Sequence, residues 1–162
     1  MAGRTGVRAT LYTFLTTPQI TNLNQVFTSF PKRINFQVGS QAGQMSRAAV
    51  VIFIQSENET RLAIGGATNG WKRVDYSVIL QVYMLSQHRN TEDVMTDFDT
   101  LIDNIKTRLR SNHNFGDSTG TLVWQGAEPI INGSYGEPAT NQEGATEIFA
   151  ELQFDVTEMI QA

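Results

Sequence analysis

The sequence predicts an α+β fold, in which a mainly antiparallel sheet carries helices packed on one face. Two adjacent segments are the basis of this prediction. Apolar side chains occupy every second position of the first segment, as on one face of a strand, at Tyr76, Val78, Leu80, Val82 and Met84. In the second segment they fall within an arc of about 100° at helical spacing, at Val94, Phe98, Leu101, Ile102, Ile105 and Leu109. We therefore expect this strand and this helix to share a core.

Length and composition predict one soluble globular domain over residues 1–162, with 40% hydrophobic and 17% charged residues. The absence of cysteine excludes disulfides, thiolate nucleophiles and cysteine metal sites. No apolar run approaches the roughly 18 residues that span a bilayer, and residues 1–8 lack the apolar segment of a signal peptide. We expect a protein without a membrane partner that stays where it is made.

The N-terminal part predicts helices and a loop. Thr5 can cap a helix that ends before Pro18, with Val7, Leu11, Phe14 and Leu15 on one side. Residues 23–30 show apolar positions at helical spacing before Pro31, which predicts a short helical turn. Residues 34–46 are polar and rich in Gly, Gln and Ser, which predicts a long mobile loop or part of a hairpin arm.

The middle of the chain predicts a three-stranded antiparallel meander. Residues 48–54 form a continuous apolar run, as in a central strand covered on both faces. Residues 56–60 predict a turn, and residues 61–64 a short strand that ends at a pair of glycines. The long alternating strand from Trp71 follows as the third member.

The later elements start with the amphipathic helix, which Asn90 or Thr91 can cap. Acidic residues near its start and basic residues near its end match the helix dipole. Further predictions are listed in chain order: a polar loop at 111–120, strand segments at 121–124 and 129–131, a second long loop at 132–144, and a terminal strand at 147–160. In that strand one face is apolar, at Ile148, Ala150, Leu152, Phe154 and Val156.

Motifs for chemistry are missing from the sequence. His88 and His113 stand in polar, turn-like contexts without metal-site spacing. Residues 133–136 do not form a nucleophile elbow, and the glycines at 65–70 lack the lysine of a phosphate-binding loop. Basic residues are dispersed, which argues against sequence-specific nucleic-acid readout. We predict no catalytic, cofactor-binding or metal-binding residue and no enzymatic activity.

The order of the elements carries a resemblance. An N-terminal helix and a Gly/Gln-rich loop precede a meander that includes residues 61–66 and 75–78; a helix at 93–110 and a strand that ends at 154–158 follow. This order resembles the tail-terminator and tail-completion proteins of long-tailed (siphovirus-type) bacteriophages. The resemblance implies a virion protein, made in the host cytoplasm, whose ring of typically six subunits caps the tail tube and joins it to the head-side connector. It implies no catalysis, and the family offers no motif from which residue roles could be carried over.

Two other classes fit the same sequence. Another virion assembly protein, such as a neck or head-closure protein or a tail-tube subunit, would have a similar size and the same lack of motifs. A tube subunit should carry a longer hairpin arm that extends the sheet of its neighbours. An unrelated enzyme or binding domain should instead concentrate perturbed polar groups in one deep pocket.

Charge is distributed unequally along the chain. Residues 1–73 carry eight basic and two acidic side chains, whereas residues 74–162 carry four basic and fourteen acidic ones. The simplest interpretation is an uneven distribution over a folded surface. A closed ring, however, needs contacts between two different surfaces of one subunit, and such surfaces can carry opposite charge.

The ring hypothesis therefore names candidate interface residues. A basic set from one subunit would face an acidic set from the next, with the members Arg4, Arg8, Lys32, Arg33 and Arg47 on one side and Glu137, Glu147, Glu151 and Asp155 on the other. Carboxylates left over would line the bore and repel the phosphates of passing DNA. The loops at 34–46 and 132–144 are expected to contact partner subunits or proteins.

Overall fold

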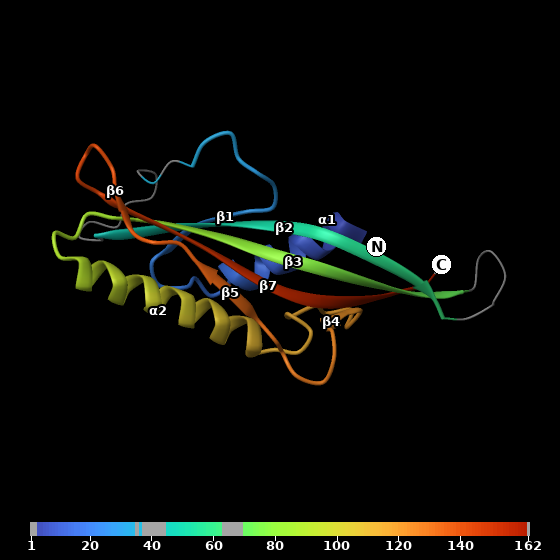
Figure 1. Ribbon diagram of the computed structural model, residues 1–162. Helices are drawn as coiled ribbons and strands as arrows, with labels where there is room; N and C mark the ends of the chain where they lie inside the picture. The colour runs from blue at the N-terminus through green and yellow to red at the C-terminus, as the bar shows by residue number, and fades with distance from the viewer. Residues whose placement is uncertain (1–2, 35, 37–44, 63–69, 162) are drawn as a thin grey trace.

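A seven-stranded sheet with two helices organises the described part of the chain, which confirms the predicted α+β class (Figure 1). The computed structural model describes residues 3–34, 36, 45–62 and 70–161. In chain order the elements are α1 (Gly3–Thr16), β1 (Leu23–Phe27), β2 (Ser46–Arg61), β3 (Trp71–Ser86), α2 (Thr91–Arg110), β4 (Leu122–Trp124), β5 (Asn132–Tyr135), β6 (Ala139–Thr140) and β7 (Thr146–Gln161).

Three 16-residue strands form the body of the sheet. The strand order is β1-β2-β3-β7-β4, and β5 and β6 also pair with β7. β1 runs parallel to β2, whereas the other pairs are antiparallel. β3 and β7 pair along their whole length, from Trp71 opposite Gln161 to Ser86 opposite Thr146. One strand edge of β7 is therefore taken by β3, and β4, β5 and β6 occupy much of the other.

The core lies between one face of this sheet and both helices, as the sequence predicts. The predicted alternating side chains of β3 and β7 and the six apolar residues of α2 are all buried in one cluster. Val7, Leu11 and Leu15 add the buried side of α1. Asn90 caps α2, and its side chain accepts a hydrogen bond from the Glu92 N–H at 3.1 Å. The predicted cap of α1 is wrong, because this helix starts at Gly3 and Thr5 lies inside it.

The helical turn predicted at residues 23–30 is also wrong. Leu23–Phe27 forms strand β1, which pairs with residues 48–51 of β2. The side chain of Asn24 strengthens this pairing, because its Oδ1 accepts the Ala48 N–H at 3.0 Å. Backbone pairing with a buried strand thus overrides the helical spacing of the apolar residues.

The turn predicted at residues 56–60 is wrong as well. β2 continues through these residues to Arg61 after a register shift between Ile54 and Ser56, and it stays paired with β3. Two long strands therefore replace the predicted meander, and β7 is their third long neighbour. The predicted strand at 61–64 lies largely outside the described residues.

The loops also differ from the predictions in part. Residues 111–120 form the expected loop, and β4 lies within the predicted strand 121–124. Residues 129–131 are not a strand, and the segment 132–144 contains β5 and β6. Most of the loop predicted at 34–46 lies outside the described residues, and its last residue begins β2.

The second face of the sheet, which we call the outer face, carries neither of the two described helices. Figure 1 shows the light-blue segment after β1 on this side, opposite α2. Phe30 packs against Phe53 of β2 with ring centroids 5.3 Å apart. Arg47 of β2 donates a hydrogen bond from Nη1 to the Phe36 carbonyl at 2.6 Å. This segment therefore covers β2, which explains why its apolar run is buried on both faces.

Candidate functional site

The outer face of the sheet combines aromatic and polar side chains that are half-buried. The rings of Tyr83 and Phe149 lie 5.0 Å apart on neighbouring strands. Gln81 donates to Glu151 at 3.1 Å and accepts the Tyr83 hydroxyl at 3.2 Å. Burial, followed by the charge of Glu151, raises the pKa of Tyr83. Aromatic rings with polar groups beside them are typical of surfaces that bind other proteins.

The predicted acidic residues gather at one edge of this face. Glu147, Glu151 and Asp155 point to the outer side of β7 at every fourth position, and Glu137 is exposed between β5 and β6. Glu147 accepts from the Asn141 amide at 3.2 Å. Across the described residues, none of the four carboxylates forms an ion pair. The structure thus aligns three members of the acidic set along β7 and places Glu137 in the segment beside this strand.

Three of the predicted basic residues lie near the opposite edge. Arg47 is half-buried on the outer face of β2, and Lys32 and Arg33 are exposed on the segment that covers β2. None of them has an ion-pair partner within the described ranges. β3 alone separates β2 from β7, and the register places Arg47 opposite Leu85 and Leu85 opposite Glu147, so the basic and acidic groups lie on the two flanks of β3.

The other two basic residues bind within their own chain. Arg4 lies 3.7 Å from the Glu57 carboxylate and donates to the Ile54 carbonyl at 3.1 Å. Arg8 donates to the Thr28 carbonyl at 2.9 Å. Both arginines therefore help to hold α1 against the sheet and the segment after β1, and the predicted basic set is divided between two places.

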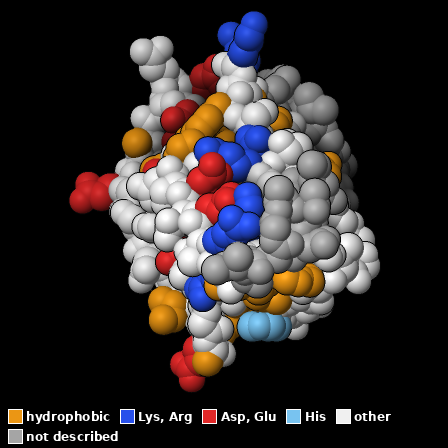
Figure 2. All heavy atoms as spheres, turned by 90° about the vertical axis from the view of Figure 1, so that its right-hand side faces the viewer, with side chains coloured by type: hydrophobic (Ala, Val, Ile, Leu, Met, Phe, Trp, Pro, Cys, Tyr) orange, Lys and Arg blue, Asp and Glu red, His pale blue; other side chains and the backbone are white. Residues whose placement is uncertain are grey.

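Ion pairs also mark the far end of the β2–β3 hairpin, which Figure 2 shows with basic and acidic side chains next to one another. Lys72 pairs with Glu59 at 2.8 Å, and Arg73 pairs with Asp75 at 2.8 Å. Such exposed pairs contribute about 0–1 kcal/mol each. This end is charged, but its charges are largely matched within the subunit.

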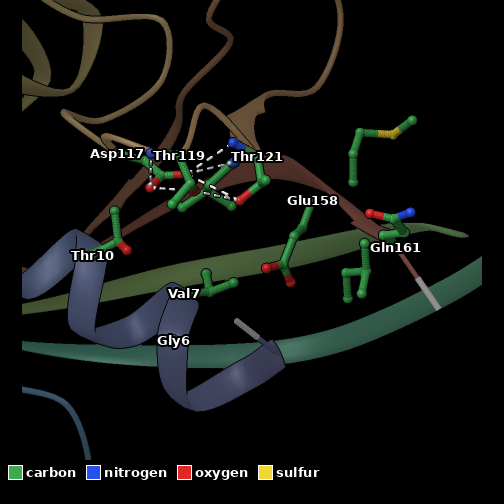
Figure 3. Close-up of a pocket in the computed structure, with 11 residues that line it drawn as sticks. Gly6, Val7, Thr10, Asp117, Thr119, Thr121, Glu158 and Gln161 are labelled. Carbon is green, nitrogen blue, oxygen red and sulfur yellow. Dashed lines mark hydrogen bonds between the residues drawn. The ribbon is translucent and has the colours of Figure 1, made fainter. Parts of the chain in front are cut away.

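A pocket of about 480 Å³ lies between α1, the end of β7 and the loop before β4 (Figure 3). Glu158 is almost fully buried there, and its Oε2 accepts hydrogen bonds from the Gly3 N–H at 3.0 Å and the Tyr76 hydroxyl at 3.1 Å. A carboxylate at the start of a helix is also stabilised by the helix dipole. Burial, followed by the negative charge of Glu158, raises the pKa of Tyr76.

Asp117 organises the loop on the other side of this pocket. Its carboxylate accepts the backbone N–H groups of Thr119, Thr121 and Leu122 at 3.1, 2.9 and 3.1 Å. The Thr119 hydroxyl donates to it at 2.7 Å. Burial would raise the pKa of Asp117, but these hydrogen bonds, that of the Thr119 hydroxyl first, outweigh it and lower the pKa to about 2.

The two carboxylates of this pocket therefore have structural tasks. Asp117 is ionised near neutral pH, so it has no proton to donate as a general acid. Glu158 links the last strand to the first helix through Gly3 and Tyr76. The pKa values of Asp117 and Tyr76 are shifted here, as an enzyme would need, but backbone and threonine hydrogen bonds account for the first shift, and burial followed by the charge of Glu158 accounts for the second.

A second polar cluster joins β2, β3 and α2. The buried Ser46 hydroxyl contacts Ser86 at 2.9 Å and donates to the Asp97 carboxylate, and His88 Nε2 lies 3.0 Å from the same carboxylate oxygen. In a hydrolytic triad the histidine stands between the serine and the acid. Here the aspartate stands in the middle, so the cluster serves to fix the start of α2 on the sheet.

Sequence reasoning missed the partners of these groups. Asp117 followed by threonines and Gly120 is a typical turn pattern, which could have indicated its role. His88 and Asp97 meet across a strand-to-helix junction, and Tyr76 and Glu158 meet across two strands. Contacts of this kind leave no local signal in a single sequence.

Comparisons with known proteins add no assignment, because no protein-family model and no curated protein matches the sequence. In the described ranges, His, Asp and Glu side chains form no group of three or more that could hold a metal ion. The described helices include none that is both long and apolar enough to cross a membrane.

Proposed function

We propose that the protein is a structural virion subunit that forms a ring, typically of six copies, at the head-proximal end of a long-tailed phage tail. The ring caps the tail tube and joins it to the head-side connector or neck protein. One observation carries this proposal: basic side chains near β2 and acidic side chains along β7, which form no ion pair among the described residues, lie on the two flanks of β3.

This charge arrangement suits a cyclic assembly. In a ring, each subunit presents one surface to the neighbour on one side and a different surface to the neighbour on the other. The basic side near β2 of one copy then meets the acidic side near β7 of the next. Exposed ion pairs are weak, so apolar contact supplies most of the affinity while charge selects the orientation.

Carboxylates outside the interface set suit a bore through which DNA passes. Glu143 is one of them: it is exposed and forms no ion pair within the described residues. Carboxylates that line the bore would repel phosphates, so that genomic DNA slides past without sequence-specific binding. The protein would be made in the host cytoplasm and reside in the virion.

A tail-tube subunit is the second candidate, and the β2–β3 hairpin favours it. Residues 55–61 of β2 are exposed, and β1 pairs only with residues 48–51, so β3 is their one strand neighbour in the described part of the chain. A free strand edge of this kind can extend the sheet of another subunit. Against this, β7 follows β3 as far as Trp71, so the hairpin is not a detached arm.

Electron microscopy of the purified protein separates the two candidates. A terminator forms single closed rings with a central hole that do not grow on concentration. A tube subunit forms stacks or tubes of increasing length. Particles without a hole at any concentration would contradict both.

A further inference from the structure

The outer edge of β7 has a gap between two of its neighbours. β4 pairs with residues 156–158 and β5 with residues 150–153, so on this edge positions 154 and 155 pair with no strand of the described residues, although β3 pairs with them on the other edge. The Gln125 N–H donates to the Asp155 carbonyl at 3.1 Å and so anchors the connecting segment at the gap. The gap holds a pocket of about 320 Å³, which we call the edge pocket.

The edge pocket has a mixed apolar and polar lining. Trp124 and Ile130 line it together with Gln153 and Asp155. Trp124 is buried, whereas Ile130 is 68% exposed. The volume is near the lower limit of about 300 Å³ for ligand pockets, so it suits one or two side chains.

An exposed aromatic residue lies over β2, the strand on the far flank of β3 from β7. Phe30 is 57% exposed although it packs against Phe53. Lys32 and Arg33 follow it, and both are exposed and without an ion-pair partner in the described ranges. An aromatic ring with basic residues beside it is the usual form of a protein-binding anchor.

Strand register places this anchor and the edge pocket at the same level. Phe53, against which Phe30 packs, is opposite Ile79, and Ile79 is opposite Gln153 of the pocket. The row runs across the sheet, from the covered strand β2 to the edge of β7. Cyclic symmetry places equivalent atoms of all subunits at the same height along the ring axis. If the strands run along that axis, two surfaces that meet between neighbours must therefore lie at the same height within each subunit.

Charge is complementary between the two surfaces. Asp155 lies at the edge pocket, and Glu128 is exposed on the segment that frames it. Neither carboxylate has an ion-pair partner among the residues described. Lys32 and Arg33 would supply the opposite charges from a neighbour.

We propose that Phe30 of one copy of this chain inserts into the edge pocket of the next copy, with Lys32 and Arg33 facing Asp155 and Glu128. This contact rests on the proposed ring and specifies its interface. Burial of the Phe30 ring supplies the apolar part, and the charges fix which edges meet.

Cysteine cross-linking tests the contact directly, because the chain has no cysteine of its own. Phe30→Cys and Ile130→Cys are made in separate, differently tagged chains that are co-expressed and oxidised. We expect a disulfide-linked pair with both tags on a non-reducing gel and little cross-linking of either variant alone. Tyr12→Cys with Ile130→Cys is the matched control, since Tyr12 is 42% exposed but lies on α1.

Charge reversal gives an independent test. Lys32→Glu with Arg33→Glu should raise the dissociation constant of the ring about tenfold, and Asp155→Lys with Glu128→Lys in the same chain should restore it. The unfolding temperature of the subunit should stay unchanged in each variant, because all four side chains are exposed. If the wild-type chain forms rings but the 30–130 cross-link does not appear, or the second charge reversal does not restore the ring, the proposed contact is wrong and the proposed ring still stands. A wild-type chain that is monomeric at the highest attainable concentration would overturn both.

Discussion

Replacing Asp117 by asparagine should destabilise the protein through one loop. The Asp117 carboxylate accepts three backbone N–H groups, from Thr119, Thr121 and Leu122. Asparagine keeps one oxygen and presents an NH₂ group in place of the other, so some of these donors lose their acceptor. The part-buried N–H groups of Thr121 and Leu122, left without an acceptor, are the main source of the expected loss.

The lowered pKa of Asp117 sets the magnitude of the expected loss of stability. Hydrogen bonds lower this pKa from 3.8 to about 2 against the opposing effect of burial. A pKa lowered this far corresponds to about 2–3 kcal/mol, and partial solvent exposure of the carboxylate reduces this to about 1–2 kcal/mol. Because the pKa is depressed in the folded state, this stability is present above pH 3.8 and is lost as the pH falls toward 2.

Urea unfolding at several pH values measures the effect. At pH 7 we expect Asp117→Asn to lower the free energy of unfolding by about 1–2 kcal/mol relative to the wild type. The difference should shrink as the pH falls from 4 to about 2, because the wild-type carboxylate then becomes protonated. Asp103→Asn on the exposed side of α2 is the control and should change little. A difference for Asp117→Asn that stays constant over this range would refute the reasoning.

Three further predictions concern the core, alkaline pH and assembly. Phe98 is 2% exposed, so Phe98→Ala should lower the free energy of unfolding by about 3–5 kcal/mol; an unchanged urea midpoint would show that the helix does not cover the sheet. Burial, followed by a neighbouring carboxylate, raises the pKa of Tyr76. The protonated Tyr76 hydroxyl therefore contributes its full stabilisation of the folded state below pH 10, and this contribution declines above pH 10. The unfolding temperature should therefore fall less steeply above pH 10 in Tyr76→Phe than in the wild type. Equal slopes for the two proteins would argue against this role of Tyr76. Reversing Glu147, Glu151 and Asp155 to lysine should weaken assembly without unfolding the subunit, whereas equal assembly at low and high salt would exclude these carboxylates from the interface.

The elements that could be predicted are those in which the periodicity of apolar residues in the sequence matches the side chains that are buried in the structure. The alternating side chains of β3 and the apolar stripe of α2 face each other in one core, so their periodicities follow from a single cause. β7 was predictable for the same reason. The caps and charges of α2 are local in sequence, and Asn90 indeed caps this helix.

The wrong predictions of secondary structure have a different physical cause. Residues 56–60 are polar because that part of β2 is exposed, and the polarity was interpreted as a turn. β5 and β6 are short, exposed strands that depend on β7 for their hydrogen bonds, so they resemble loops in the sequence. β1 is a strand because β2 lies beside it, which no local spacing can reveal.

The candidate interface was predictable in part. Alternation along β7 already places Glu147, Glu151 and Asp155 on one side of the strand. Net charge could not separate basic groups that bind within the chain, such as Arg4 and Arg8, from Lys32 and Arg33, which form no ion pair among the described residues. The edge pocket depends on how the segment between β4 and β5 crosses the sheet, and this crossing is a tertiary feature.

Native mass spectrometry of the purified protein tests the central proposal most directly. The chain has a mass of 18.0 kDa, so a closed ring of six would appear at six times this value, about 108 kDa. We predict one dominant species at a fixed multiple of the subunit mass, which stays the same as the concentration rises. A monomer of 18.0 kDa at every concentration would contradict the ring.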